Sequence, residues 1–515
     1  MTAAAAVVVV VIALGLQPGT DHDASGSQAS GALSQPLLPA TVSIDPAARG
    51  RAVPSSFLGI STEYWTLPFW EQQVRVLERV LALLHASGDG PFVLRIGGDS
   101  ADHAFWEPSR RETPEWAFEL DPAWLSQTRT LVAETRARVI LDLNLVTATP
   151  RIAALWAEAA EAAFPRGSIL GFEIGNEPDI YSRDGWLTAL KDAAGLKQVL
   201  PAQISAAGYA HDFAAYARVI SRFAPAAHIF GPALANPVIH ADWVSVLLHG
   251  PHPGLAMITA HRYPYSECAF PGTPAFATVD RLLSEHATAG MARALRPAIE
   301  LAHRYGLPFH LTELNSVTCG GRPGVSNSFA TALWAPDALF ELLQAGVDGV
   351  NIHVREHAIN AAFVLTPDGL MAHPLLYGLI TFARMLGPQA RLMATHVHAP
   401  ALAHLKAWGV RVSGGIVHLL LIDKGTAGVR VALRVPARGV ATVERLLAPS
   451  AGSHSDVTLA GQYLDRQGRW RGEPVRATLV AGRHGFVVIV PRQTAALVTL
   501  RLRTASVSHG RRRSI

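Results

Sequence analysis

Short apolar runs alternate with amphipathic stretches along most of the chain. The runs end in glycine or polar residues, as buried strands do, and there are eight of them: 57–62, 92–98, 139–145, 169–175, 228–234, 256–262, 309–314 and 349–354. Between them, residues 71–86 and 294–306 carry apolar side chains at helical spacing, and the second of these segments closes on Gly306. The pattern predicts strands and helices in alternation.

Repeated alternation of apolar strands with helices is typical of a parallel sheet covered by helices. Eight such units within roughly 300 residues favour a closed (β/α)8 TIM barrel, an α/β fold. A doubly wound sheet is the alternative. No GxGxxG motif follows the first strand, so the barrel is the preferred prediction.

The pattern changes after residue 387 to alternating apolar and polar positions interrupted by Gly, Pro, Asp and Ser. Such a pattern predicts a C-terminal all-β sandwich domain, whose expected role is to pack against the barrel, with sugar binding as the alternative. We therefore divide the chain into a signal peptide with a flexible linker (1–32), the barrel (33–387), the β-sandwich domain (388–505) and a basic tail (506–515). The first segment of the barrel range is a candidate for a strand of the β domain.

The first 19 residues form an apolar run of signal-peptide length, which Pro18 ends before it is long enough to span a bilayer comfortably. A stretch rich in Ser, Gly and Ala follows, as a cleavage region and linker would. We expect an exported protein, periplasmic or extracellular, without stable membrane insertion after processing. No Lys or Arg precedes the apolar run, which leaves a misplaced start or an uncleaved N-terminal anchor as alternatives.

Charge and cysteine content narrow the function classes. The formal net charge of +4 comes from 44 basic and 40 acidic residues spread along 515 residues, so no nucleic-acid surface is expected. The two cysteines, Cys268 and Cys319, lie in no CxxC motif and near no His cluster, and neither a metal nor a cofactor is expected. They follow the sixth and seventh strands, in neighbouring loops at one end of the barrel. In an exported chain this favours a disulfide over two free thiols.

Two glutamates stand where a barrel carries its chemistry, at the C-terminal ends of strands. Glu177 follows the fourth strand and Glu313 lies near the end of the seventh. Two carboxylates facing each other across a barrel mouth can cleave a glycosidic bond, one as acid and the other as nucleophile. The alternative for either residue is a helix cap or surface position. Glu173 lies inside the fourth strand and is interpreted as structural, with Arg95 as its partner, because a buried carboxylate needs one.

Several motifs occur together and in a fixed order along the chain. They are "FLGISTEYW", "LRIGGDSADH", "FEIGNEPD", "AHRYPY", "LTELNS" followed by "CGGRPGVSNSFATALW", and "GVNIHV". In this combination, over roughly residues 40 to 505, the chain resembles the retaining β-glucuronidases and heparanases of glycoside hydrolase family 79. "GNEP" alone is shared by a wider superfamily, whereas the combination with the glycine motif is more specific.

The resemblance implies a role for each motif residue. Glu177 would be the acid/base and Glu313 the nucleophile, both catalytic. The substrate-binding set would be Glu63, Asp99, Asn176, His261, Tyr263, Thr318, Gly320 and Gly321. Within it, Asn176 would contact the sugar 2-hydroxyl, Tyr263 and His261 would support the nucleophile, and Glu63 would hold hydroxyls on the far side of the ring.

The glycine segment around Gly320 and Gly321 is the candidate binding site for the carboxylate of a uronic sugar. The backbone N–H groups of Gly320 and Gly321 can approach a carboxylate closely because no Cβ intervenes. Relatives with glucuronidase activity tend to have a tyrosine just before the glycines, where this chain has Thr318, whose hydroxyl donates from a shorter stem. Arg322 is expected to point outward.

These observations predict a retaining, exo-acting β-glucuronidase-like hydrolase without a cofactor, acting on a glycan or glycoconjugate that bears a uronic acid. One alternative is another retaining glycosidase with the same two glutamates, of the xylosidase or arabinofuranosidase type. Another is a non-catalytic carbohydrate-binding relative, against which both glutamates argue, since binding alone needs neither.

Overall fold

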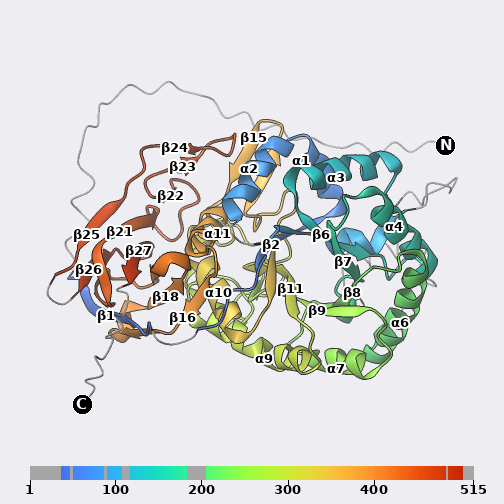
Figure 1. Ribbon diagram of the computed structural model, residues 1–515, viewed down its shortest axis with the longest axis horizontal. Coiled ribbons are helices and arrows are strands. Elements are labelled where there is room, and N and C mark those ends of the chain that lie inside the picture. The colour runs from blue at the N-terminus through green and yellow to red at the C-terminus, as the bar shows by residue number, and fades with distance from the viewer. Residues whose placement is uncertain are drawn as a thin grey trace, which may run out of the picture. The chain divides into compact units, whose positions relative to one another are not determined.

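Eight parallel strands close into a barrel in the computed structural model, which describes residues 36–46, 50–85, 90–106, 116–181, 204–482 and 485–502 (Figure 1). The strand order is β11-β13-β2-β3-β6-β7-β8-β9. The predicted eight-stranded barrel is therefore confirmed, and the doubly wound alternative is wrong. The predicted signal peptide with its linker and the predicted basic tail lie outside the described residues.

The barrel strands coincide closely with the eight apolar runs. Their bounds are β2 Leu58–Glu63, β3 Val93–Gly97, β6 Arg138–Leu143, β7 Ile169–Ile174, β8 Ile229–Leu234, β9 Leu255–Arg262, β11 Phe309–Leu314 and β13 Gly349–His353. Most of their residues are buried, because helices cover the outside and side chains fill the inside. Such strands read as continuous apolar runs.

Helices surround the barrel. The long ones are α2 Val74–Leu84, α3 Pro122–Thr135, α4 Pro150–Ala163, α6 Ala206–Phe223, α7 Ala241–His249, α9 Ala289–Arg304, α10 Ala330–Ala345 and α11 Pro374–Met385, and the short ones are α1 Leu67–Glu71 and α8 Val279–Leu282. Three of them begin with Pro at the first helical position behind a residue in extended conformation, as good N-termini do. None of the helices in the described ranges is both long and apolar enough to cross a membrane.

Two antiparallel-rich sheets form the C-terminal part. The larger follows the order β16-β18-β19-β27-β21-β22, with β25 on β21, and its strands are β16 Arg391–Met393, β18 Leu405–Arg411, β19 Ile416–Asp423, β21 Ala437–Leu447, β22 Thr458–Leu459, β25 Ala477–Val480 and β27 Thr494–Leu502. The smaller has the order β17-β1-β20-β26, with β17 Thr395–His398, β20 Val429–Arg434 and β26 Phe486–Val490. Side chains of both sheets share one apolar cluster.

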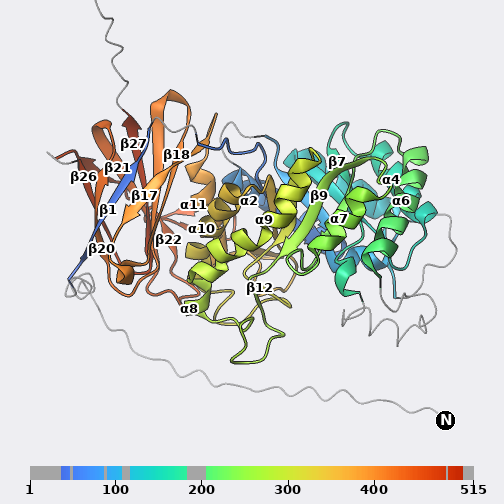
Figure 2. The same ribbon diagram turned by 90° about the horizontal axis from the view of Figure 1, so that it is seen from below.

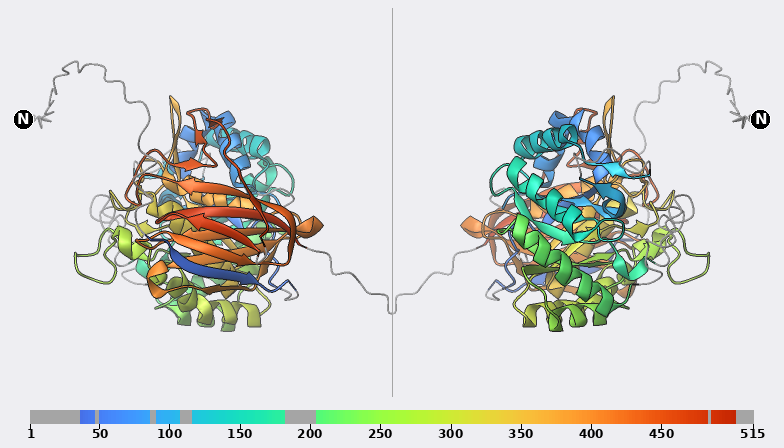
Figure 3. Two further views of the ribbon diagram at one scale, coloured as in Figure 1. Left: turned by 90° about the vertical axis from the view of Figure 1, so that its left-hand side faces the viewer. Right: turned by 90° about the vertical axis from the view of Figure 1, so that its right-hand side faces the viewer.

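The remaining strand of the smaller sheet comes from the other end of the sequence. Strand β1, Leu38–Ile44, pairs parallel with β20 and antiparallel with β17. In Figure 3 it is the blue strand beside the orange and red ones. Its alternating pattern places Ala40, Val42 and Ile44 in the sandwich core. The N-terminal segment thus joins the C-terminal sheets before the chain enters the barrel.

Helices α10 and α11 lie between the barrel strands and the C-terminal sheets (Figures 1 and 2) and contact β18, β19 and β21. A buried ion pair joins the two parts: Asp337 of α10 binds the ammonium of Lys424, which follows β19. The indole N–H of Trp408 in β18 donates to the same carboxylate at 2.8 Å. This fully buried carboxylate is compensated only by groups from the sheet side among the described residues.

Four short two-stranded sheets form in the loops of the described residues. They are β4 Ala104–Phe105 with β5 Phe118–Glu119, β10 Tyr265–Ser266 with β12 Val317–Thr318, β14 Phe363–Thr366 with β15 Gly369–Ala372, and β23 Tyr463–Leu464 with β24 Trp470–Arg471. The pair β10–β12 belongs to the site described next, because it ties together the loops that follow β9 and β11.

Candidate active site

A cavity of about 400 Å³ opens where the C-terminal ends of the barrel strands meet. Its floor is polar because β2 ends in Glu63, β11 carries Glu313 next to its last residue, and β13 ends in His353. Loops add the rest of the wall. The lining residues are Glu63, Asp99, Glu177, Ile180, Tyr263, Cys268, Glu313, Thr318, Cys319, Gly320, His353, Arg355 and Asn360.

The two predicted catalytic glutamates meet in this cavity. One carboxylate oxygen of Glu177, one of Glu313 and a ring nitrogen of His261 all lie within 4.8 Å of one another. Glu177 follows β7 and Glu313 lies in β11, and β8 and β9 separate these two strands in the closed barrel, so both carboxylates reach the cavity from one part of its rim.

Glu313 is surrounded by groups that stabilise its charge. Its Oε1 accepts from Arg95 at 2.7 Å, and its Oε2 accepts from the hydroxyl of Tyr263 at 2.9 Å. Burial alone raises the pKa of Glu313, but His353, His261, Arg95 and the hydroxyl bond outweigh it and hold that pKa well below its usual range. This carboxylate is therefore an anion.

Glu177 has the opposite electrostatic environment. It follows β7 in the left-handed conformation, at φ 51°, and its N–H donates to the carbonyl of Ala233 at 3.0 Å. Burial is the largest effect on its carboxyl, and together with the charge of Glu313 it outweighs the hydrogen bond from His261 and raises the pKa of Glu177. Glu177 thus retains a proton to higher pH than Glu313.

His261 lies closer to Glu177 than to Glu313. Its Nδ1 lies 2.9 Å from Oε1 of Glu177 and 3.8 Å from Oε2 of Glu313. Burial lowers its pKa, but the two carboxylates prevail and raise the pKa of His261 to about 8. Both residues expected around Glu313 lie next to it: Tyr263 donates a hydrogen bond to it, whereas His261 acts on it through its charge and is hydrogen-bonded to Glu177.

Arg95 is fully buried below the cavity and binds three carboxylates. Its Nε donates to Glu173 at 2.8 Å, its Nη2 to Asp142 at 2.8 Å and its Nη1 to Glu313 at 2.7 Å. The predicted pairing of Glu173 with Arg95 is confirmed. Glu173 also accepts from the hydroxyl of Thr312 at 2.8 Å, and it does not line the cavity.

Three further predicted residues are near the catalytic pair. Glu63 is buried and accepts from the N–H of Ser100 at 2.8 Å. Asp99 lines the cavity with a partly exposed carboxylate. Asn176 is buried and does not line the cavity; its Oδ1 accepts from Arg95 at 3.1 Å, and its amide NH₂ has no acceptor among the described residues.

The glycine segment differs from its prediction in one respect. The N–H of Gly321 donates to the carbonyl of Thr318 at 3.3 Å, closing a turn, and Gly321 does not line the cavity. A Cβ on Gly321 would meet Asn360 at 2.7 Å, which explains the glycine. Gly321 is therefore not available as a carboxylate donor. Gly320 and Thr318 do line the cavity.

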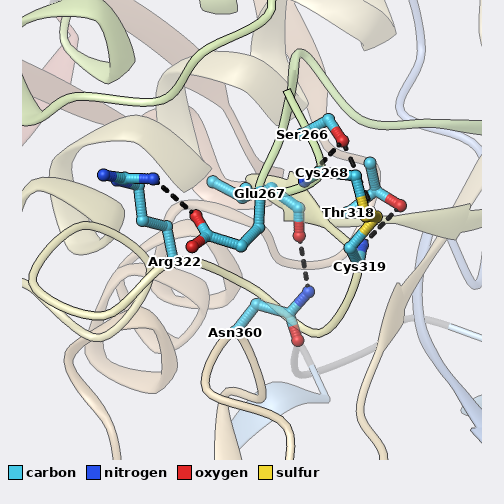
Figure 4. Close-up of a disulfide and its surroundings, with 8 residues drawn as sticks. Ser266, Glu267, Cys268, Thr318, Cys319, Arg322 and Asn360 are labelled. Atoms are coloured by element: carbon cyan, nitrogen blue, oxygen red, sulfur yellow. Dashed lines mark hydrogen bonds and ion pairs between the residues drawn. A yellow bond between two sulfur atoms is a disulfide. The ribbon is translucent and has the colours of Figure 1, made fainter. Parts of the chain in front are cut away.

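The predicted disulfide between Cys268 and Cys319 is present, with the Cα atoms 6.1 Å apart (Figure 4). Both cysteines line the cavity, so the bridge forms part of its wall. Arg322 points away from the bridge, as Figure 4 shows, and donates to Glu267 at 2.8 Å. It stacks over Phe276 and does not line the cavity.

Four lining residues were missed by the sequence analysis: the apolar Ile180 and the polar His353, Arg355 and Asn360. His353 lies 3.5 Å from both Glu63 and Glu313. Arg355 donates to Asp99 at 3.2 Å. A signal was available for His353 and Arg355, because "HVREH" places polar residues at the end of the eighth strand, where a barrel carries its site.

Glu177, His261 and Glu313 are also the group among the described residues whose atoms could hold a metal ion. Both oxygens of Glu313 already accept hydrogen bonds, from Arg95 and Tyr263. The buried guanidinium of Arg95 would repel a second cation nearby. This donor set fits acid–base chemistry better than metal binding.

No protein-family model matches the chain. No curated protein matches it either. Solved structures do share its fold. A 4-O-α-L-rhamnosyl-β-D-glucuronidase from Fusarium oxysporum 12S has a TM-score of 0.71 at 17% identity, covering 90% of this chain and 99% of that one.

Two further structures show the same architecture. A family 51 arabinofuranosidase from Xanthomonas axonopodis pv. citri has a TM-score of 0.65 at 14% identity, covering 90% of this chain and 100% of that one. A family 44 endoglucanase from Clostridium thermocellum has a TM-score of 0.60 at 12% identity, with the same coverage. At such identities the similarity establishes a common fold: a barrel with a C-terminal β domain.

Proposed function

We propose that the protein is a retaining glycoside hydrolase of the β-glucuronidase type, with Glu177 as acid/base and Glu313 as nucleophile. The observation that carries the proposal is the pair itself: two carboxylates with oxygens within 4.8 Å of each other and oppositely shifted pKa values. Retaining enzymes hold their carboxyl groups about 5–5.5 Å apart, whereas inverting enzymes need about 6.5–9.5 Å for a water. The motif resemblance and the fold shared with known glycosidases support the same reaction.

The chemistry proceeds in two displacements. In the first, Glu313 attacks the anomeric carbon while Glu177 gives its proton to the departing glycosidic oxygen, which leaves as an alcohol. In the second, Glu177 takes a proton from water, whose oxygen displaces Glu313 from the sugar. Glu177 ends protonated, as it began, and the configuration is retained.

The surrounding residues supply binding and orientation. Arg95 and Tyr263 hold the nucleophile anionic and in place through one hydrogen bond to each oxygen. Asn176 offers its NH₂ group to the 2-hydroxyl, and Glu63 and Asp99 offer carboxylates to hydroxyls on the far side of the ring. Export is part of the proposal and is supported by the disulfide, which persists in oxidising compartments.

The test is a panel of p-nitrophenyl glycosides: β-glucuronide, β-glucoside, β-xyloside and α-arabinofuranoside. Hydrolysis of the β-glucuronide with the highest kcat/KM, and an initial β-anomer by product NMR, is the expected result. An initial α-anomer would refute retention. A preference for xyloside or arabinofuranoside would leave the two-glutamate mechanism standing but exclude the glucuronidase assignment. No turnover of any glycoside, with Glu177 and Glu313 intact, would favour a carbohydrate-binding relative.

A further inference from the structure

Arg355 is the one arginine or lysine lining the catalytic cavity among the described residues. It lies two residues past the end of β13, and its side chain is 30% exposed, so the guanidinium is within reach of a ligand. Its one contact to a carboxylate is the bond from Nη1 to Asp99 at 3.2 Å.

Most of this guanidinium is not used by the protein. Arginine carries five N–H donors, and in the described part of the chain Asp99 is the only hydrogen-bond acceptor that Arg355 has. Nη2 lies close to Gly320, since a Cβ added there would lie 3.4 Å from it. The N–H of Gly320 likewise has no acceptor among the described residues. The guanidinium of Arg355 and the backbone of Gly320 thus lie close together in the wall of the cavity.

The charge of the cavity makes this wall selective. Four carboxylates line it, those of Glu63, Asp99, Glu177 and Glu313. An acidic sugar would add another negative charge near the anionic Glu313 and Glu63, and a cation on the wall would offset this repulsion. Arginine is the side chain best suited to that task, because its planar fork matches a carboxylate in a bidentate arrangement.

We propose that Arg355, together with the N–H of Gly320, binds the carboxylate of a uronic sugar and determines the preference for acidic over neutral glycosides. This assignment rests on the proposed glycosidase function and names its specificity-determining residue. It also replaces the pair of glycine N–H groups expected from the sequence, because the N–H of Gly321 is committed to Thr318.

The competing interpretation is that Arg355 only orients Asp99, which then binds sugar hydroxyls. In that case the loss of Arg355 would weaken acidic and neutral substrates equally, because both present the same ring hydroxyls. If Arg355 binds the sugar carboxylate, only kcat/KM on the uronoside falls. The ratio of the two kcat/KM values therefore separates the interpretations.

The experiment compares Arg355→Met with the wild-type enzyme on p-nitrophenyl β-glucuronide and β-glucoside. We expect kcat/KM on the glucuronide to fall by about 100-fold or more, as for other lost charge pairs, with the value on the glucoside changing less than about threefold. Arg322→Met is the matched control: it removes an arginine paired with one carboxylate on the neighbouring loop, outside the cavity, and should leave the ratio unchanged. An equal fall on both substrates in Arg355→Met overturns the proposal.

Binding measurements test the proposal without turnover. By calorimetry, wild-type protein and Arg322→Met should bind free glucuronate at least about tenfold more tightly than glucose, and Arg355→Met should lose this difference. Arg355→Lys, which keeps the charge without the fork, should retain part of it and serves if the Met variant does not fold. Equal binding of glucuronate and glucose by the wild type refutes the role of Arg355. Glucuronate binding without hydrolysis of any glycoside would instead refute the proposed function and leave Arg355 as the acid receptor.

Discussion

Replacing Glu177 with glutamine removes the proposed acid while disturbing little else. The two side chains have the same length, and the amide oxygen can still accept the hydrogen bond that His261 Nδ1 makes at 2.9 Å. Glu313 keeps its bonds from Arg95 and Tyr263, because neither contacts Glu177. Glu177→Gln should therefore retain a bound substrate and an ionised nucleophile but have no proton to give.

The size of the effect depends on the leaving group. General acid catalysis contributes on the order of 10²–10⁴ in rate, equivalent to about 3–5 kcal/mol. For an alkyl glycoside, whose alkoxide is a poor leaving group, kcat of the variant should fall by the whole contribution of the general acid. For a dinitrophenyl glycoside, whose phenolate departs without protonation, the rate of the first displacement should fall little in the variant.

The pH profile gives a second reading of the same variant. Glu177 must be protonated to act, so wild-type activity is present below its raised pKa and is lost as pH rises through it. Glu313 must be ionised, so activity is lost only when pH falls through its lowered pKa. Because His261 is coupled to Glu177, the basic limb is a property of that pair. Glu177→Gln should lose the part of the basic limb that comes from Glu177 and keep the acidic limb.

Initial rates on alkyl and dinitrophenyl β-glucuronides, measured across pH, provide the assay. Glu267→Gln is the matched control, since it neutralises a carboxylate near the mouth that does not line the cavity, and it should behave as wild type. Hydrolysis of the alkyl glycoside by Glu177→Gln at the wild-type rate would refute the assignment of the acid.

Three further changes test the surroundings of the site. Arg95→Met removes the cation 2.7 Å from Glu313, so the acidic limb of kcat/KM should move to higher pH; an unmoved limb would show that Arg95 does not keep the nucleophile ionised. Cys268→Ser with Cys319→Ser opens a loop of sequence separation 51 and should cost up to about 4 kcal/mol in urea unfolding, with a raised KM, whereas an unchanged midpoint and KM would contradict a stabilising role. Lys424→Met removes the cation bonded to the buried Asp337, which keeps only Lys406 at 3.9 Å and the indole N–H of Trp408, and should destabilise the fold by up to about 5 kcal/mol; a loss below about 1 kcal/mol in the same assay would argue against the ion pair.

The barrel could be predicted from the sequence because its determinants are local. Each strand is buried over most of its length and is therefore a mostly apolar run, in which the few polar residues are those of the site and its supports. Helix ends were less well predicted: the segment 71–86 forms a helix only from Val74 to Leu84, because Leu67–Glu71 forms a separate short helix before it. Strand β1 pairs with β20 across most of the chain, and its register depends on contacts that no local pattern contains.

The site residues also divide into those that the local sequence predicts and those that depend on distant contacts. Glu177 and Glu313 could be located because a strand count alone places them at the barrel mouth. Arg355 could not be assigned a role, because its partner Asp99 is 256 residues away in sequence. Gly321 was assigned a ligand contact that a turn within its own loop prevents, since a motif does not show which N–H groups the local structure already uses.

The buried charges below the cavity explain how one arginine can keep Glu313, the proposed nucleophile, ionised. Arg95 contacts three carboxylates, and three anions around one cation would be strongly repulsive in a dry interior. Burial is the largest effect on Asp142, and with Glu173 and Glu313 nearby it outweighs Arg95 and raises the pKa of Asp142 well above its usual value, so Asp142 competes less than an ordinary aspartate for the positive charge of Arg95. Glu313 keeps its bond from Arg95 at 2.7 Å through one oxygen, and the hydroxyl of Tyr263 binds the other at 2.9 Å, which is the arrangement that the proposed nucleophile next to a protonated acid requires.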